Sequence, residues 1–88
     1  MAATLTADVL QDDLAVTLAR VLATANKRAR ELGVDALQSL ITITQHFDNG
    51  PRWRINYGPK DYVGRRGGDL IIEVDASDIS IRQVLRGQ

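Results

Sequence analysis

The side chains that carry out most acid–base, nucleophilic and metal chemistry are sparse and scattered in this chain. His46 is the only histidine and there is no cysteine, which excludes zinc sites built from several histidines or thiolates of one chain. Ser39, Ser77 and Ser80 all lie outside the G-x-S-x-G pattern that presents a nucleophile on a sharp turn. The sequence shows no combination of a nucleophile, a base and a group that would orient the base. The sequence therefore predicts no catalytic residue, no metal site and no cofactor, and we expect that the protein is not an enzyme.

Glu73 and Asp75 most resemble a pair of catalytic carboxylates. They lie two residues apart in a segment that alternates as a β-strand, so both side chains project from one face. Antiparallel pairing with the preceding strand places Arg54 opposite Glu73 and Arg52 opposite Asp75. We interpret these four residues as structural ion pairs. His46, on the polar face of the first strand, is interpreted as a solvated or hydrogen-bonded side chain.

The segment Gly58–Asp69 is rich in glycine and cations, and three interpretations are open for it. A phosphate-binding Walker loop has the spacing GxxxxGK[ST] and leads into a helix, whereas this segment leads into an apolar strand. A hairpin connector needs glycines for its turns and charges for solubility. A binding loop for a protein or an anionic partner is the third interpretation, because loops on rigid scaffolds often carry recognition. We favour the connector. The candidate binding residues are Lys60, Tyr62, Arg65 and Arg66.

The elements that would position these residues begin with a helix. Apolar residues recur at helical spacing from about residue 7 to residue 32. The members of this stripe are Leu10, Leu14, Leu18, Val21, Ala25 and Leu32. Thr4 or Thr6 can cap the start, and Gly33 can adopt the left-handed conformation that ends a helix. We expect one long N-terminal helix over about residues 7–32.

After residue 38 the apolar period changes to two, which is typical of β-strands. The first strand, at about 39–47, should point Ile41, Ile43 and Phe47 to one face. The turn after it has the sequence Asp-Asn-Gly-Pro, in which Asn and Gly tolerate a positive φ.

The second and third strands, at about 52–57 and 70–75, fit an antiparallel hairpin with Trp53 facing inward opposite Val74. A fourth strand begins near Ile79. Residues 80–87 remain open between a strand and a short helix, because Ser80–Gln83 would also serve as a capping box.

Length and composition predict a single domain spanning residues 1–88, with the helix at about 7–32 and the sheet at about 39–86. The fold class is α+β: one long N-terminal helix packed on a three- to four-stranded antiparallel meander. Eleven basic residues balance eleven acidic ones, which argues against a dedicated nucleic-acid binder. No apolar run reaches the roughly 20 residues of a membrane span. With no cysteine and no leader pattern, we expect a cytoplasmic protein.

The order of helix and meander resembles the cystatin-like and PepSY-like folds. The resemblance to PepSY-like domains extends over about residues 39–88. It rests on Trp53-Arg-Ile-Asn-Tyr57, on Gly67-Gly-Asp-Leu-Ile-Ile-Glu-Val-Asp75 and on the run from Ile79 to Gln88. PepSY-like domains are discussed as inhibitory or protein-binding modules and cystatins as protease inhibitors, so the resemblance implies a binding function.

These observations favour a small noncatalytic protein-interaction module: an inhibitor, an immunity-like protein or a subunit of a larger assembly. A small-ligand or enzymatic site between helix and sheet is the alternative. Weak nucleic-acid binding through the basic segment 52–66 is a third hypothesis, with Arg52, Arg54, Lys60, Arg65 and Arg66 as its cations. We expect a protein partner and no membrane. We also expect a homodimer that forms through a sheet edge or the outer sheet face, because unprotected edges pair with other chains.

Overall fold

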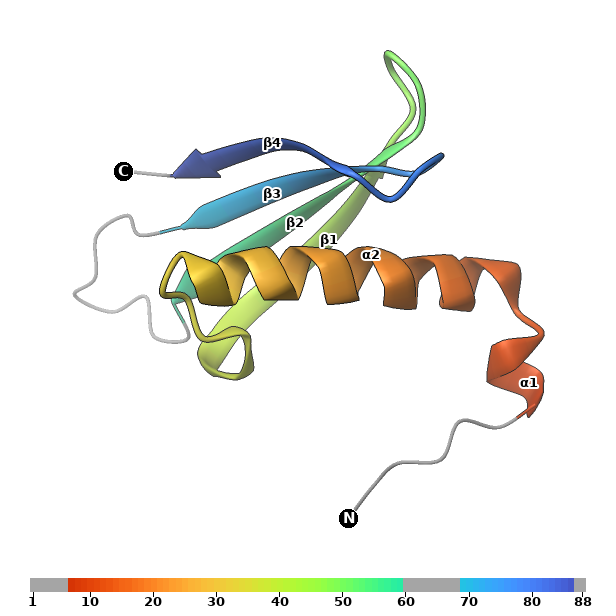
Figure 1. The fold of residues 1–88 in the computed structure, drawn as a ribbon, viewed down its shortest axis with the longest axis horizontal. Coiled ribbons are helices and arrows are strands. Elements are labelled where there is room, and N and C mark those ends of the chain that lie inside the picture. Colours follow the sequence, from red (N-terminus) through yellow and green to blue (C-terminus); the bar gives the residue numbers. More distant parts are fainter. Residues whose placement is uncertain (1–6, 60–68, 87–88) are drawn as a thin grey trace.

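The fold is a helix packed on a four-stranded sheet. The computed structural model describes residues 7–59 and 69–86. Its elements are α1 (Ala7–Leu10), α2 (Asp13–Glu31), a short 3-10 helix η1 (Ala36–Gln38), β1 (Ser39–His46), β2 (Arg52–Pro59), β3 (Leu70–Asp75) and β4 (Ile81–Arg86). The strands are antiparallel in the order β1-β2-β3-β4, with α2 across one face of the sheet (Figure 1). The predicted α+β class and antiparallel meander are confirmed. The sequence allowed either a strand or a short helix over residues 80–87. Residues 81–86 form a strand.

The N-terminal helix is interrupted before Asp13, so the prediction of one continuous helix from about residue 7 is wrong at its start. Asp12 has an extended backbone, with φ −91° and ψ 107°. Its carboxylate accepts a hydrogen bond of 3.0 Å from the backbone N–H of Ala15. A side chain that caps a first turn in this way competes with a continuous helical backbone. The chain therefore forms the single turn α1 and starts α2 anew.

The C-terminal end of α2 follows the prediction. Gly33 has a φ of 84°, and its N–H donates to the carbonyl of Arg30 at 3.0 Å. The N–H of Val34 donates to the carbonyl of Ala29 at 2.9 Å. These two bonds form a Schellman motif, which satisfies carbonyls that the last helical turn leaves without partners.

The core lies between α2 and the central strands. Small residues one turn apart on α2, Val21, Ala25 and Ala29, are fully buried, so the helix can approach the sheet closely. The strand residues that they meet are Trp53, Ile55 and Tyr57 from β2 and Leu70, Ile72 and Val74 from β3. The apolar stripe predicted on the helix is therefore correct in its middle. At its start it is wrong, because Leu10 and Leu14 are each 58% exposed.

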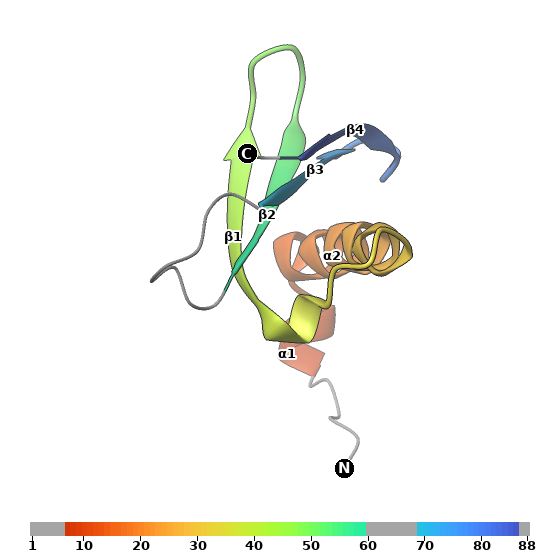
Figure 2. The same ribbon diagram turned by 90° about the vertical axis from the view of Figure 1, so that its left-hand side faces the viewer.

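The register between β2 and β3 agrees with the sequence prediction. Trp53 pairs with Val74 on the side of the helix, and Arg54 pairs with Glu73 on the outer face. β4 continues the sheet beyond β3, with an irregularity in register at Glu73 and Val74. The predicted turn after β1 is also present, because Asn49 and Gly50 have φ values of 58° and 91°. This turn projects beyond the end of the sheet (Figure 2).

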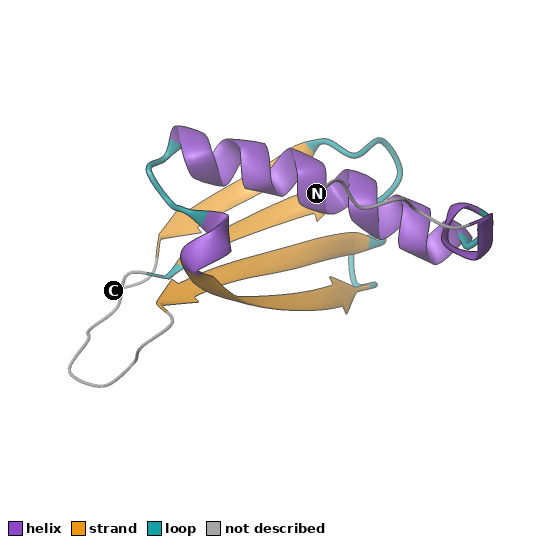
Figure 3. Cartoon of the chain, turned by 90° about the horizontal axis from the view of Figure 1, so that it is seen from below, coloured by secondary structure: helices purple, strands orange, loops and turns teal. Residues whose placement is uncertain are grey.

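The helix covers the sheet unevenly. α2 packs on β3 and β2, and β1 lies to one side of it (Figure 2, Figure 3). A helix is about 10 Å across and strands are spaced by about 4.8 Å, so one helix covers about two strands. Ile41 and Ile43 pair with Tyr57 and Ile55 and so share the face of the helix, yet each remains 37% exposed.

Candidate functional site

The binding residues predicted from the sequence, Lys60, Tyr62, Arg65 and Arg66, lie outside the described residues. The strands on either side of their segment are described. β2 and β3 pair antiparallel from Arg52–Asp75 to Tyr57–Leu70, so the segment connects the two strands of a hairpin. It leads into a strand and not into a helix, which is the topology expected of a hairpin connector.

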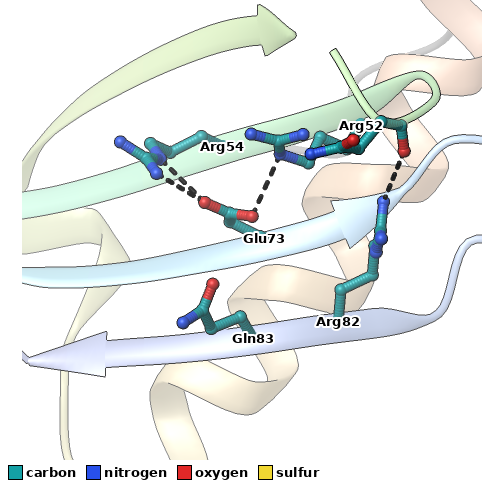
Figure 4. Close-up of a pocket in the computed structure, with 6 residues that line it drawn as sticks. Arg52, Arg54, Glu73, Arg82 and Gln83 are labelled. Carbon is teal, nitrogen blue, oxygen red and sulfur yellow. Dashed lines mark hydrogen bonds and ion pairs between the residues drawn. The ribbon is translucent and has the colours of Figure 1, made fainter. Parts of the chain in front are cut away.

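Two surfaces of the described residues qualify as candidate sites, and the first is a polar cluster on the outer face of the sheet. Alternation along β2 and β3 turns Arg52, Arg54 and Glu73 away from the helix (Figure 4). Arg54 donates two hydrogen bonds to Oε2 of Glu73, from Nε at 3.0 Å and from Nη2 at 2.6 Å. Nε of Arg52 lies 3.1 Å from Oε1, as an ion pair without hydrogen-bond alignment. The two guanidinium groups thus hold both oxygens of one carboxylate.

Glu73 is 5% exposed although no helix covers this face among the described residues. The hydrogen bonds from Arg54 hold the pKa of its carboxyl below the ordinary value, and they outweigh the opposing effect of burial. Glu73 is therefore ionised at neutral pH. A carboxylate held this firmly as an anion is a poor general acid or base.

A polar recess of about 320 Å³ adjoins this carboxylate. It is lined by Asn49, Arg52, Arg54, Glu73, Arg82 and Gln83. Arg82 reaches it from β4, and its polar contacts with other described residues are long, 3.5 Å to the carbonyl of Asn49 and 3.8 Å to the Asp75 carboxylate. Asp48 lies 3.4 Å from Nη2 of Arg52. The carboxylates of Asp48, Asp75 and Glu73 balance the positive charges of three arginines, so the surroundings of the recess have no net charge. These arginines are Arg52, Arg54 and Arg82.

The remaining residues considered for chemistry have structural surroundings. His46 lies on the outer face beside Arg52, with Nδ1 4.0 Å from Oδ1 of Asp48. Its Nε2 is buried without a hydrogen-bond partner among the described residues. Ser39 donates to the carbonyl of Asp35 at 2.8 Å.

Ser77 and Ser80 lie in the turn between β3 and β4, where each donates to an aspartate two residues earlier in the chain. The hydrogen bonds that Ser77 donates hold the pKa of Asp75 below its usual range. No described serine is paired with a base, so the arrangement offers no activated nucleophile. No group of three or more potential metal ligands lies together in residues 7–59 and 69–86.

The second surface is β1 itself, for which the sequence analysis named no binding residues although it expected self-association through a sheet edge or the outer face. β1 pairs with β2 along one side, and no described strand lies along the other. Six of its eight residues are exposed, and exposed apolar side chains occur on both of its faces. They are Leu40 at 50% on the outer face and Ile41 and Ile43 at 37% on the helix face. Leu37 before the strand and Phe47 after it are 86% and 69% exposed.

A signal for this surface was present in the sequence. The sequence predicted one helix on three to four strands, and one helix covers only about two strands. Which strands would be left uncovered depends on where α2 docks, and that position follows from packing around Val21 and Ala25. A smaller, largely apolar recess of about 290 Å³ is lined by Val9 and Leu10 of α1 and by residues of α2 that include Ala19 and Arg20.

Comparisons with known proteins add no assignment to these surfaces. The chain matches no protein-family model, no curated protein and no solved structure. The resemblance to PepSY-like and cystatin-like domains therefore stays a prediction. None of the described helices is long and apolar enough to cross a membrane.

Proposed function

We propose that the protein is a noncatalytic interaction module that binds its partner by strand addition at β1. The observation that carries this proposal is the exposure of β1 along one backbone edge and on both of its faces. In strand addition, backbone hydrogen bonds supply affinity and alternate side chains supply specificity. Leu40, Ile41 and Ile43 provide the apolar contacts of such an interface.

The two edges of the sheet differ in how they are protected. Natural edge strands avoid unwanted pairing through charged side chains, proline or a bulge. β4 carries Arg82 and Arg86, and its register with β3 shifts at Glu73 and Val74. β1 has an uninterrupted register with β2, and its sequence Ser-Leu-Ile-Thr-Ile-Thr-Gln-His contains no proline, lysine, arginine or carboxylate. This contrast supports β1 as the binding edge.

The experiment compares an edge variant with a matched control. Thr42→Lys adds a charge to β1 at an exposed outer-face position, and Gln83→Lys adds the same charge to β4. A partner captured from the source cells is identified, purified and titrated against each variant. We expect Thr42→Lys to weaken binding by at least about tenfold, equivalent to 1.4 kcal/mol, and Gln83→Lys to leave it unchanged. A partner that binds both variants equally well would contradict strand addition at β1.

A second candidate function, binding of a small anion, is favoured by the recess on the outer face. Arg82 keeps donors available there because its described contacts are long. This position differs from the ligand site expected between helix and sheet, where the described side chains form the packed core. Titration with inorganic phosphate, followed by amide NMR shifts in the wild type and in Arg82→Ala, tests it. Shifts at β4 that disappear in the variant would support this function.

The nucleic-acid hypothesis receives less support. Arg54 forms an ion pair with Glu73, and Arg52 forms ion pairs with Asp48 and Glu73. Neither arginine is therefore a free phosphate-binding cation. An inhibitor, an immunity-like protein and an assembly subunit all remain forms that the interaction module can take. A cytoplasmic location also remains a prediction.

A further inference from the structure

We propose that the strand added to β1 is β1 of a second copy, paired antiparallel with Thr42 at the twofold axis. This inference rests on the proposed function and names the partner. The sheet would then run without interruption through eight strands. A closed twofold pair of this kind uses the same surface on both subunits and leaves no β1 edge free for further growth.

The register follows from the pattern of side chains on β1. Placing Thr42 opposite Thr42 of the partner subunit brings Ile41 opposite the partner's Ile43, and the symmetry repeats that contact. Leu40 then lies opposite the partner's Thr44 on the outer face. Side chains directly opposite each other in this way, above all Ile41 and the partner's Ile43, make the cross-strand contacts that stabilise antiparallel sheets. A register centred on Ile43 would place Ile41 opposite the partner's Gln45 and would retain a single apolar pair.

The flanking residues point to the same register. Leu37 and Phe47 are the two most exposed large apolar side chains among the described residues, at 86% and 69%. Each lies five residues from Thr42, one before it and one after it. The register centred on Thr42 therefore brings Leu37 to the same end of the paired strands as Phe47 of the partner subunit. In an isolated monomer, the described residues leave both side chains largely exposed. In the symmetric pair, Leu37 of each chain lies near Phe47 of the partner subunit.

Charge favours this pairing over the alternatives. The stretch from Ser39 to Gln45 contains no ionisable side chain, so two copies of β1 oppose no like charges. Pairing β4 with its own copy would bring Arg82 and Arg86 near the same two arginines of the other strand. Pairing β1 with β4 of another copy is heterologous, and it would leave an open edge at each end for continued growth.

The position of α2 leaves room for the pair. Antiparallel pairing about a twofold axis keeps both helices on the same face of the joined sheet. Because α2 packs on β2 and β3, the two helix axes would be separated by about four strand spacings, or about 20 Å. Helices in contact have axes about 8–10 Å apart, so the two copies of α2 would not collide.

The absence of cysteine allows a direct test by single-cysteine variants. Residues directly opposite in an antiparallel pair have Cα atoms about 4.5–5.5 Å apart, which lies within the range of about 4.4–6.8 Å that a disulfide spans. Under mild oxidation, Thr42→Cys should form a covalent dimer. Ile43→Cys would place its Cα atoms about 8 Å apart and Thr44→Cys about 14 Å apart, so neither should cross-link readily.

A mixing experiment checks the same register at a second point. Leu40→Cys and Thr44→Cys should each stay uncross-linked alone and should form a disulfide-linked heterodimer when they are mixed. Light scattering provides the measurement without cross-linking. The wild type should have twice the 9.7 kDa mass of one chain, Thr42→Lys should be monomeric because two lysines would meet at the axis, and Gln83→Lys should remain dimeric.

Each outcome separates this inference from the proposed function. A wild type that is monomeric at several hundred micromolar would overturn the homodimer, and strand addition would survive if another partner still required an uncharged Thr42. A dimer in which Ile43→Cys cross-links and Thr42→Cys does not would overturn the register. A dimer that persists in Thr42→Lys would place self-association outside β1 and would count against the inference. Circular dichroism of each variant verifies that the sheet is intact.

Discussion

Glu73 shows how single residues shape the outer face of the sheet. Glu73 lies on β3 between Arg54 of β2 and Gln83 of β4. Both of its oxygens meet guanidinium nitrogens within 3.1 Å. The sequence predicted the pairing of Arg54 with Glu73 because alternation fixes which residues share a face. It also placed Arg52 opposite Asp75, which the register confirms, but the guanidinium of Arg52 reaches diagonally to Glu73 and back to Asp48 and does not pair with Asp75.

Replacement of Glu73 by glutamine should destabilise the fold by about 1–3 kcal/mol at pH 7, because the guanidinium groups of Arg52 and Arg54, whose side chains are 14% and 38% exposed, lose their ionised acceptor. The folded-state pKa of Glu73 lies below its ordinary value. The contribution of this carboxylate is therefore present above the unfolded-state pKa and is lost as the pH falls through the folded-state value. Urea unfolding of both proteins should show a difference that shrinks below about pH 4.

The exposed pair Arg28–Glu31 offers a control for this measurement. Its side chains are 43% and 51% exposed, so Glu31→Gln should change the free energy of unfolding by no more than about 0.5 kcal/mol. Equal effects of Glu31→Gln and Glu73→Gln would show that the cluster on the outer face contributes no more than a surface ion pair.

Tyr57 provides a pH dependence of opposite sign. Its hydroxyl donates to Oδ1 of Asn26 at 2.6 Å, and burial raises its pKa from 10.0 to about 12, with the charge of Arg30 acting in the other direction. Between about pH 10 and pH 12 the unfolded chain loses this proton and the folded chain keeps it, so stability should fall over that window. In Tyr57→Phe this part of the alkaline destabilisation should be absent.

The same variant should cost about 0.5–1.5 kcal/mol at neutral pH, because Asn26 loses a donor. Absorbance titration of the folded wild type should show a tyrosine that ionises near pH 12. A free energy of unfolding with the same dependence on alkaline pH in both proteins would contradict this assignment.

At the scale of elements, sequence periodicity predicted the strands and the register of the central hairpin, because alternation of burial is a local property. The helix start was missed for a reason that is equally local. Asp12 lies within an apolar pattern that suits a helix, and its capping hydrogen bond to Ala15 outweighs the pattern. The placement of α2 over β2 and β3 could not be predicted from any single element, since it depends on how Ala25 and Ala29 pack against the sheet.

Gly33→Ala should destabilise the protein by about 1–2 kcal/mol, because a side chain disfavours the positive φ of 84° at the end of α2. Apart from Gly33 and its two chain neighbours, no described residue has an atom within 4 Å of the position that a Cβ would occupy, so the effect should come from backbone strain. Gly33→Asn, whose side chain tolerates the left-handed region, should recover part of the loss. Thermal unfolding followed by circular dichroism measures both variants, and equal stabilities of the two would argue against strain as the cause.

At the scale of the whole molecule, α2 and the four strands leave an apolar surface that residues 7–59 and 69–86 do not cover. The composition does not predict this apolar surface, because the fraction of apolar residues is ordinary and exposed apolar atoms are common on protein surfaces. What distinguishes this surface is its continuity along β1, with Leu37 and Phe47 at the two ends. That continuity appears only once the position of the helix is known.

Phe47→Ser should leave the free energy of unfolding within about 0.5 kcal/mol of the wild type, because the ring is 69% exposed in the monomer. If the ring is covered in a pair of chains, the same change should weaken self-association. Sedimentation velocity over a concentration series measures this effect. Arg28→Ser, an exposed change on α2, is the control and should leave the association constant unchanged. A wild-type association constant in Phe47→Ser would exclude this ring from the contact.

The single tryptophan provides an intrinsic fluorescence probe that should respond to folding and hardly respond to association. Trp53 is 6% exposed beneath α2 and lies on β2, so the whole of β1 separates it from the free edge of the sheet. Its emission should therefore shift to longer wavelength when the helix separates from the sheet, and it should hardly change when β1 acquires a neighbour. Fluorescence would then record folding alone while light scattering records association, so one sample could yield both equilibria without a label.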